Sequence, residues 1–239
     1  MNHSFLLDLA LAVIPVVLAI TLHEAAHGYA ALALGDTTAR DAGRLSLNPI
    51  RHIDRVGTII LPGFLLITQL LLPPHRIMFM FGWAKPVPVS AYKFANPRRG
   101  MAVVAIAGPA MNFFLAWLAA LVFPMDGPTG AWTAIAAQFL VYFMLSNVVL
   151  GLFNLLPIPP LDGGRIAVGI LPLPLARGLA RLEGAGILIV LLVVFVLPHM
   201  LGIDPVGAAL RTVLPWTFRV LFYLAGHGGA GDGLDGDFI

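Results

Sequence analysis

Three apolar stretches of this chain, residues 5–34, 101–124 and 133–156, are each long enough to cross a lipid bilayer as a helix. A helix rises about 1.5 Å per residue, so roughly 20 apolar residues span a hydrocarbon core of about 30 Å. Only 11% of the residues are charged, whereas soluble domains have roughly 25%. Together with the apolar stretches 186–201 and 206–226, this pattern predicts an all-α polytopic membrane protein, a helical bundle of about five spans.

The basic residues indicate how the chain is oriented. All 14 lysines and arginines fall in four segments: residues 40–55, 76–99, 165–181 and 211–219. Cytoplasmic loops carry an excess of such residues, so we expect these segments inside the cell and the N-terminus outside, with the chain in the cell (inner) membrane. The turns at 125–133 and 198–205 should lie outside. A net charge of +2 that comes from so few groups does not indicate nucleic-acid binding.

The stretch 56–72 lies between two segments that are both expected in the cytoplasm, so it should not cross the membrane. Its 17 residues would span only about 25 Å as a helix. We predict a re-entrant segment with its bend at Pro62-Gly63. After it, the patches around 77–81 and 87–92 predict a short membrane-associated β-hairpin, in which Pro86 and Pro88 fit only an edge strand.

The first apolar stretch contains His-Glu-Ala-Ala-His at residues 23–27. Ionisable residues within a membrane span are costly and usually mark function. Residues i and i+4 share one face of a helix, so His23 and His27 can bind one metal ion, while Glu24 can deprotonate a water molecule. The chain has no cysteine, so histidines and carboxylates must hold any metal. A buried His/Glu cluster without metal is the alternative.

A catalytic zinc site usually has three protein ligands. The candidates for the third are Asp162, Asp54, His52 and Glu183. We favour Asp162, because it follows the third long apolar stretch at a point where prolines break the helix and Gly163-Gly164 permits a tight backbone. A surface Pro-Asp-Gly turn is the alternative for this segment.

Three motifs together resemble the site-2 protease family of intramembrane zinc metalloproteases: HEAAH in the first span, AGPAMN at 107–112 and NLLPIPPLDGGR at 154–165. The resemblance covers residues 5–165, roughly two thirds of the chain. It implies one Zn²⁺ per chain. The residue roles it implies are as follows: His23, His27 and Asp162 as ligands, Glu24 as general base, and Asn154 as a group that binds the substrate or its oxyanion. The stretch FGWAKPVPV resembles the family's hairpin, whose edge pairs with the extended substrate.

The activity implied by the resemblance is hydrolysis of peptide bonds in or near transmembrane segments, as in regulated intramembrane proteolysis. The implied partners are a transmembrane protein substrate and the lipid bilayer. Many bacterial relatives carry a PDZ domain between the spans that match 101–124 and 133–156. Here the connection 125–132 is too short for one, which indicates a PDZ-less subgroup. The substrate, the need for a prior cut and the oligomeric state stay open.

Several assignments have two interpretations. His52 and Asp54 could support a ligand histidine or cap a loop, and Asn112 could contact the site or join helices. We expect one domain over residues 1–226, with its core at 5–165, and a disordered Gly/Asp tail at 227–239. Rival functions are a membrane transporter for metals or other ions and a metal-free pseudoprotease that binds membrane partners.

Overall fold

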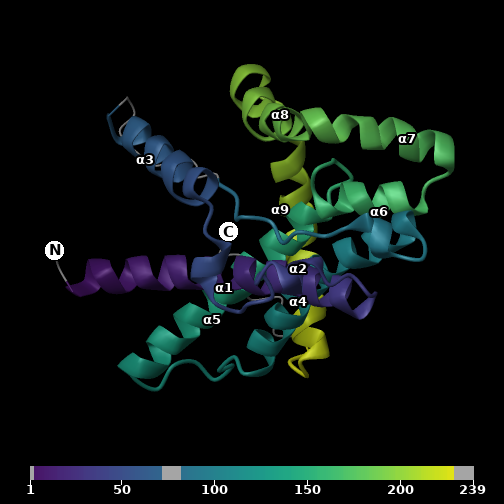
Figure 1. The fold of residues 1–239 in the computed structure, drawn as a ribbon. Helices are drawn as coiled ribbons and strands as arrows, with labels where there is room; N and C mark the ends of the chain where they lie inside the picture. The colour runs from purple at the N-terminus through teal and green to yellow at the C-terminus, as the bar shows by residue number, and fades with distance from the viewer. Residues whose placement is uncertain (1–2, 72–81, 229–239) are drawn as a thin grey trace.

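The computed structural model describes residues 3–71 and 82–228, and all regular secondary structure in this part of the chain is helical (Figure 1). Three long helices form the centre of the molecule: α1 (His3–Ala33), α4 (Pro97–Leu121) and α5 (Ala131–Asn154). The buried faces of α1 and α4 are rich in alanine, such as Ala19 on α1 and Ala116 on α4. Small side chains let membrane helices approach closely, so these helices can share one tight interface.

Four helical segments of the described residues are long and apolar enough to cross a membrane: Leu6–Ala33, Pro97–Leu121, Ala131–Asn154 and Leu173–Pro198. The sequence predicted about five such spans. The difference is α9 (Pro205–Leu224), which forms a helix but is not among the four candidates. Its two arginines, Arg211 and Arg219, make it less apolar than the others.

Helix α9 runs antiparallel to α5. Leu214 packs in one buried cluster with Val148, and Phe222, further along α9, packs in another with Met144, which lies earlier on α5. The N-terminal end of α9 therefore lies where α5 ends. The prediction that the turn 198–205 lies outside, together with the turn 125–133, rested on charge placement and stays a prediction. The packing of α9 against α5 favours the other side.

The remaining helices are short. They are α2 (Thr38–Asp41), η1 (Pro49–His52), η2 (Arg55–Ile60), α3 (Leu61–Leu71), η3 (Ala91–Lys93), α6 (Asp162–Ile170), α7 (Leu173–Arg181), η4 (Leu182–Ala185), α8 (Gly186–Leu191) and η5 (Leu192–Leu201). Helix α6 is fastened to α4 by Arg98, whose guanidinium donates to the carbonyls of Val168, Gly169 and Leu171 at 3.0, 3.1 and 2.6 Å. These bonds satisfy carbonyl groups at the C-terminal end of α6 and fix its position.

The stretch that was predicted to be re-entrant is one helical run. The π-helical η2 continues directly into α3, and the run passes through Pro62-Gly63 without a break, where it changes from π- to α-helical geometry. Figure 1 shows α3 projecting away from the central helices. The run is shorter than the four candidate spans, so the prediction that it does not cross stays a prediction.

The predicted β-hairpin is not supported by the described residues. Residues 77–81 lie outside them, and residues 82–90 form no strand. Instead this segment is held by the chain around η1 and η2: the amides of Trp83 and Lys85 donate to the carbonyls of Gly57 and His52 at 3.1 and 2.8 Å. Pro86 and Pro88 have no N–H to offer a strand ladder, which explains why alternating apolar residues do not form one here.

The first residues of the tail 227–239, which was predicted to be disordered, are ordered. The His227 Nε2 donates to the carbonyl of Ala120 at 3.0 Å, so the residues just after α9 are fastened to the end of α4. Residues 229–239 lie outside the described part of the chain.

Candidate metal centre

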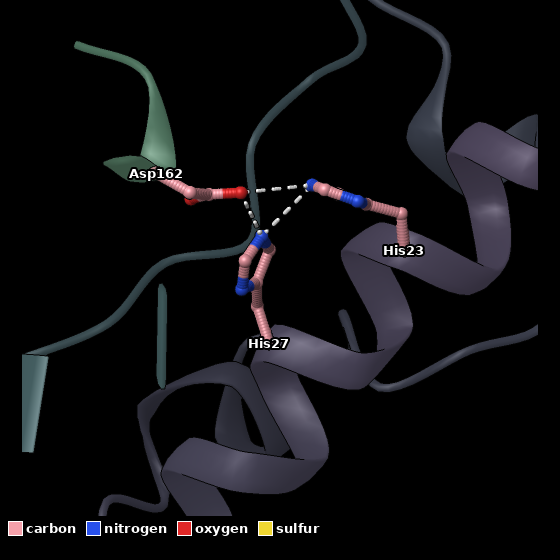
Figure 2. Close-up of side chains that lie close together, drawn as sticks. All are labelled: His23, His27 and Asp162. Atoms are coloured by element: carbon pink, nitrogen blue, oxygen red, sulfur yellow. Dashed lines mark hydrogen bonds and ion pairs between the residues drawn. The ribbon is translucent and has the colours of Figure 1, made fainter. Parts of the chain in front are cut away.

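Two histidines of α1 and one aspartate of α6 converge on a single point (Figure 2). His23 and His27 lie one helical turn apart, and their Nε2 atoms are 3.1 Å from each other. Asp162, the first residue of α6, places its Oδ2 3.1 Å from His23 Nε2 and 3.2 Å from His27 Nε2. His23 and Asp162 are only 4% and 6% exposed. The structure thus brings together the three residues that were predicted to be ligands.

The other ring nitrogen of each histidine faces a carbonyl oxygen. His23 Nδ1 lies 2.6 Å from Oδ1 of Asn112, and His27 Nδ1 lies 2.7 Å from the backbone carbonyl of Val104. A carbonyl oxygen only accepts hydrogen bonds, so each Nδ1 carries the hydrogen and donates it. In a neutral imidazole the Nε2 then presents a lone pair, which is the form that binds a metal ion.

The three converging atoms fit a tetrahedral metal ion. With bonds of about 2.0–2.1 Å, a zinc ion holds neighbouring ligand atoms roughly 3.3 Å apart. The observed separations of 3.1, 3.1 and 3.2 Å are close to that value. The Oδ2 of Asp162 is buried without a hydrogen-bond partner in the described structure. Such an atom is costly to bury unless a cation or donor satisfies it, so His23, His27 and Asp162 are suited to a divalent metal.

Helix α4 leaves room for the two imidazoles at Gly108. A Cβ on this residue would lie 2.5 Å from His27 Nε2 and 2.6 Å from His23 Nε2, closer than non-bonded atoms approach. Glycine thus permits the two rings to rest against the backbone of α4. Because α4 also supplies Asn112 and Val104, it shapes the centre without contributing a ligand.

A cavity of about 370 Å³ opens beside these residues, and Glu24 lines it. The Glu24 Oε2 accepts a hydrogen bond from the amide of Val87 at 3.1 Å, which ties the carboxylate to the irregular segment 82–90. The rest of the wall is mainly apolar and includes Phe153 and Val190. A carboxylate in a largely apolar cavity next to a metal centre is suited to proton transfer.

Asn154 also lines the cavity, at the C-terminal end of α5. Its Nδ2 donates to the carbonyl of Leu150, one turn earlier, at 3.0 Å. The structure thus brings Asn154 to the same cavity as Glu24, as predicted, and its role there stays a prediction.

Three other residues named from the sequence do not join the centre. His52 donates from Nε2 to the carbonyl of Ser46 at 2.7 Å, and Asp54 caps η2 through the amides of Val56 and Gly57. Glu183 pairs with Arg165 at 3.3 Å. Among the residues that the structure describes, His23, His27 and Asp162 form the one group of three or more potential metal ligands. His52 and Asp54 therefore cap and brace loops.

Asp36 fastens the cavity wall to the end of α1. It is completely buried, and it accepts hydrogen bonds from the amides of Thr38 and Ser90 and from the Thr38 hydroxyl. Lys93 Nζ lies 3.3 Å from its Oδ1. Burial raises the pKa of Asp36, but these hydrogen bonds and Lys93 lower it more, to about 2. This carboxylate is therefore ionised at neutral pH and holds residues 90–93 in place.

The sequence interpretation missed Asn147. It donates to the Phe143 carbonyl and accepts from Asn112 Nδ2, each at 2.8 Å. An amide in an apolar helix is a signal that could have drawn attention to it. The sequence gives no sign that the Val104 carbonyl accepts from His27, because every residue has a carbonyl group.

Comparison with known proteins connects this centre to a family of hydrolases. The profile of "Peptidase family M50" matches residues 124–197. The chain is 38% identical over 191 residues to "Putative zinc metalloprotease YwhC" of Bacillus subtilis, an alignment that covers 78% of this chain and 80% of that protein.

Two mycobacterial proteins named "Putative zinc metalloprotease Rip2" are also similar. The protein of Mycolicibacterium smegmatis is 30% identical over 61% of this chain and 51% of its own length. That of Mycobacterium tuberculosis is 30% identical over 86% of this chain and 69% of its own length. No solved structure matches the chain.

Proposed function

The chain belongs to peptidase family M50, the site-2 protease family, and from this premise we propose that it is a zinc-dependent membrane endopeptidase. The observation that carries the proposal is the convergence of His23, His27 and Asp162 beside a cavity lined by Glu24. The proposed substrates are membrane proteins, cut in or near a transmembrane segment. Apolar helices and an apolar cavity wall support this substrate class.

His23, His27 and Asp162 would hold one zinc ion. When bound, zinc supplies Lewis acidity, which polarises a peptide carbonyl and lowers the pKa of a water molecule to about 7. The names of the relatives and the His/His/carboxylate set both support zinc over softer or harder metals.

Glu24 is the proposed general base. Its carboxylate takes a proton from the attacking water and then delivers it to the leaving amine of the substrate. The Val87 amide, which donates to Glu24 Oε2, keeps the carboxylate directed into the cavity. Asn154 would donate an amide hydrogen to the oxygen that becomes negatively charged during attack.

The substrate would bind as an extended segment. In a helix the scissile carbonyl is already hydrogen-bonded to its own backbone, so the segment must unwind first. The irregular segment 82–89 contributes several residues, among them Trp83 and Val87, to one wall of the cavity. We propose that the substrate lies against this wall. The basic segments support a position of the centre near the cytoplasmic face of the inner membrane.

The experiment that tests this function compares zinc content with cleavage in detergent-purified protein. A set of synthetic transmembrane peptides serves as the substrate, and mass spectrometry detects the products. We expect about one zinc per chain in the wild type. Glu24→Gln should keep the zinc and lose cleavage by about 100-fold or more, while His23→Ala should lose both. Equal zinc in wild type and His23→Ala would overturn the ligand assignment, and folded wild type without zinc would overturn the function.

A further inference from the structure

Two completely buried amides, Asn112 of α4 and Asn147 of α5, connect the proposed metal centre to the backbone of α5. Asn147 Nδ2 donates to the Phe143 carbonyl, and Asn147 Oδ1 accepts from Asn112 Nδ2, both at 2.8 Å. Asn112 Oδ1 then accepts from His23 Nδ1 at 2.6 Å. Buried amides are costly unless they are paired, so this run of bonds is unlike incidental surface contacts.

The direction of each bond follows from backbone carbonyls that can only accept. The Phe143 carbonyl can only accept, so Asn147 must direct its NH₂ group there and its oxygen toward Asn112. Asn112 directs its NH₂ group toward two acceptors, the oxygen of Asn147 at 2.8 Å and the carbonyl of Ala19 at 3.3 Å, and its own oxygen toward His23. The shorter of these two bonds is the one to Asn147.

The Asn112 oxygen requires a hydrogen on His23 Nδ1, which leaves a lone pair on Nε2, facing Asp162. If Asn112 rotated by half a turn, its bond with His23 would no longer form. If Asn147 rotated, Asn112 would be held only by its longer bond to the Ala19 carbonyl.

The second histidine is oriented differently. His27 Nδ1 donates to the backbone carbonyl of Val104, and no side chain takes part. A substitution that rotates or removes an amide should therefore change the tautomer of His23 and leave that of His27 unchanged. This difference gives the test an internal reference.

We propose that Asn147, acting through Asn112, is a positioning residue that sets the tautomer and ring orientation of His23. Asn147 does not contact the metal centre, and nothing in the sequence motifs marks it. The consequence for metal binding rests on the function proposed above, whereas the consequence for the His23 tautomer does not.

A matched pair of substitutions separates hydrogen bonding from packing. In Asn147→Thr the hydroxyl can donate to the carbonyl one turn earlier and accept from Asn112. Thr21 and Thr217 already make such a donation in this protein, at 2.7 and 2.9 Å. Asn147→Val has nearly the same shape, with a methyl group in place of the hydroxyl, so it can neither donate nor accept.

The tautomer is read by ¹⁵N NMR of histidine-labelled protein in detergent without zinc, since a protonated and an unprotonated ring nitrogen differ strongly in chemical shift. His23→Gln identifies the His23 signals. We expect the Nδ1-protonated form of His23 in wild type and Asn147→Thr, and a measurable fraction of the other tautomer in Asn147→Val. In that variant only the longer bond to the Ala19 carbonyl still orients Asn112. The His27 signals should be the same in all three, which also shows that the variants fold. An unchanged His23 tautomer in Asn147→Val would overturn the proposal.

Zinc affinity, measured by competition with a chromophoric chelator at one pH, provides the second readout. Removing a partner that orients a ligand weakens metal binding by about 10–100-fold. We expect a loss of this size in Asn147→Val and a smaller loss in Asn147→Thr. Equal losses in the two variants would assign Asn147 a packing role and overturn the proposal. Absence of zinc binding in wild type, with the tautomer change still present, would overturn the proposed function and leave the positioning role standing.

Discussion

Gly108 makes room for the two proposed histidine ligands because it has no side chain. Both imidazoles rest against it, and a Cβ would lie within 2.6 Å of either Nε2. We therefore expect Gly108→Ala to displace the rings and lower zinc affinity by 100-fold or more, on the order of 3 kcal/mol. The measurement is the zinc content of purified protein after dialysis against a weak chelator.

Gly178→Ala is the matched control for this substitution, because nothing lies within 4 Å of a Cβ at Gly178. It makes the same chemical change in helix α7 and should leave the zinc content at the wild-type level. Normal zinc in Gly108→Ala would show that α4 can move away from the two rings.

For single residues, the sequence predicts only those roles that depend on local helix geometry. His23 and His27 could be paired because an i, i+4 spacing defines a helix face by itself. Asp162 could be favoured only through its place at a broken helix end, and its meeting with α1 needs the fold. Asn147 could not be assigned at all, because its role depends on which face of α5 meets α4. The same limit applies to His52, which the sequence could not separate from the site.

The short helix α6 is held in place by a side chain whose role the sequence does not reveal. In the sequence, Arg98 and Arg99 are equivalent basic residues at the start of an apolar stretch. In the structure, only Arg98 donates hydrogen bonds to the end of α6. Hydrogen bonds from a charged group contribute about 1.5–3 kcal/mol each. We expect Arg98→Ala to lower both the melting temperature and zinc affinity, because α6 carries Asp162.

Arg99→Ala is the comparison for Arg98→Ala, since it removes the same charge from the adjacent position while its side chain is not bonded to α6. Thermal unfolding in detergent and zinc competition should both be near wild type in this variant. If the two alanine variants lost stability and zinc equally, the effect would come from membrane orientation and not from the capping of α6.

Asp36 makes the junction between α1 and the segment that reaches Glu24 sensitive to acid. Its pKa is lowered to about 2 in the folded protein, from about 3.9 in an unfolded chain. A lowered pKa stabilises the fold fully above the unfolded value and progressively less as the pH falls through the folded value. The contribution, on the order of 2 kcal/mol at neutral pH, should therefore decrease between about pH 4 and pH 2.

Asp36→Asn tests this dependence because it keeps the shape and removes the ionisation. We expect the variant to melt at a lower temperature than wild type at pH 6, and the difference to shrink at pH 3. A difference that stays constant from pH 6 to pH 3 would show that the loss comes from the replaced acceptor oxygen and not from the charge of Asp36.

Long helices were the most predictable elements, because a run of apolar residues is visible without knowledge of the fold. The segment 82–90 was not predictable, since its alternating apolar residues are typical of a strand but its prolines and its bonds to Gly57 and His52 hold it as irregular chain. The predicted bend at Pro62-Gly63 is not found, for a related reason. Proline is tolerated there because the helical run changes from π- to α-helical geometry at that point.

For the whole molecule, the direction of α9 determines where both its ends lie. If α4, α5 and α9 cross the membrane, the turn before α9 lies on the same side as the end of α5, and Gly228 lies on the side of the α4–α5 turn. We expect a single cysteine at Ile203 to react with a membrane-impermeant reagent from the same side as one at Ala95. A cysteine at Asp126 or Gly228 should react from the other side.

The natural chain has no cysteine, so each variant reports a single position. Intact cells and inverted vesicles carrying the same variants give the two sides. If the cysteine at Ile203 reacted together with that at Asp126, α9 would run in the opposite direction, and α8 with η5 would cross the membrane instead. The positive-inside rule alone predicts that second result, so the experiment separates packing from charge.

The proposed ligands lie on α1, the first helix of the described chain, and on α6, which follows all three central helices. During synthesis α1 enters the membrane with both histidines in place, while Asp162 is made only after α5. A nascent chain therefore holds no complete metal centre until the bundle has assembled around it. If the proposed function holds, a partly made copy cannot cut neighbouring membrane proteins, because its zinc ligands are not yet together.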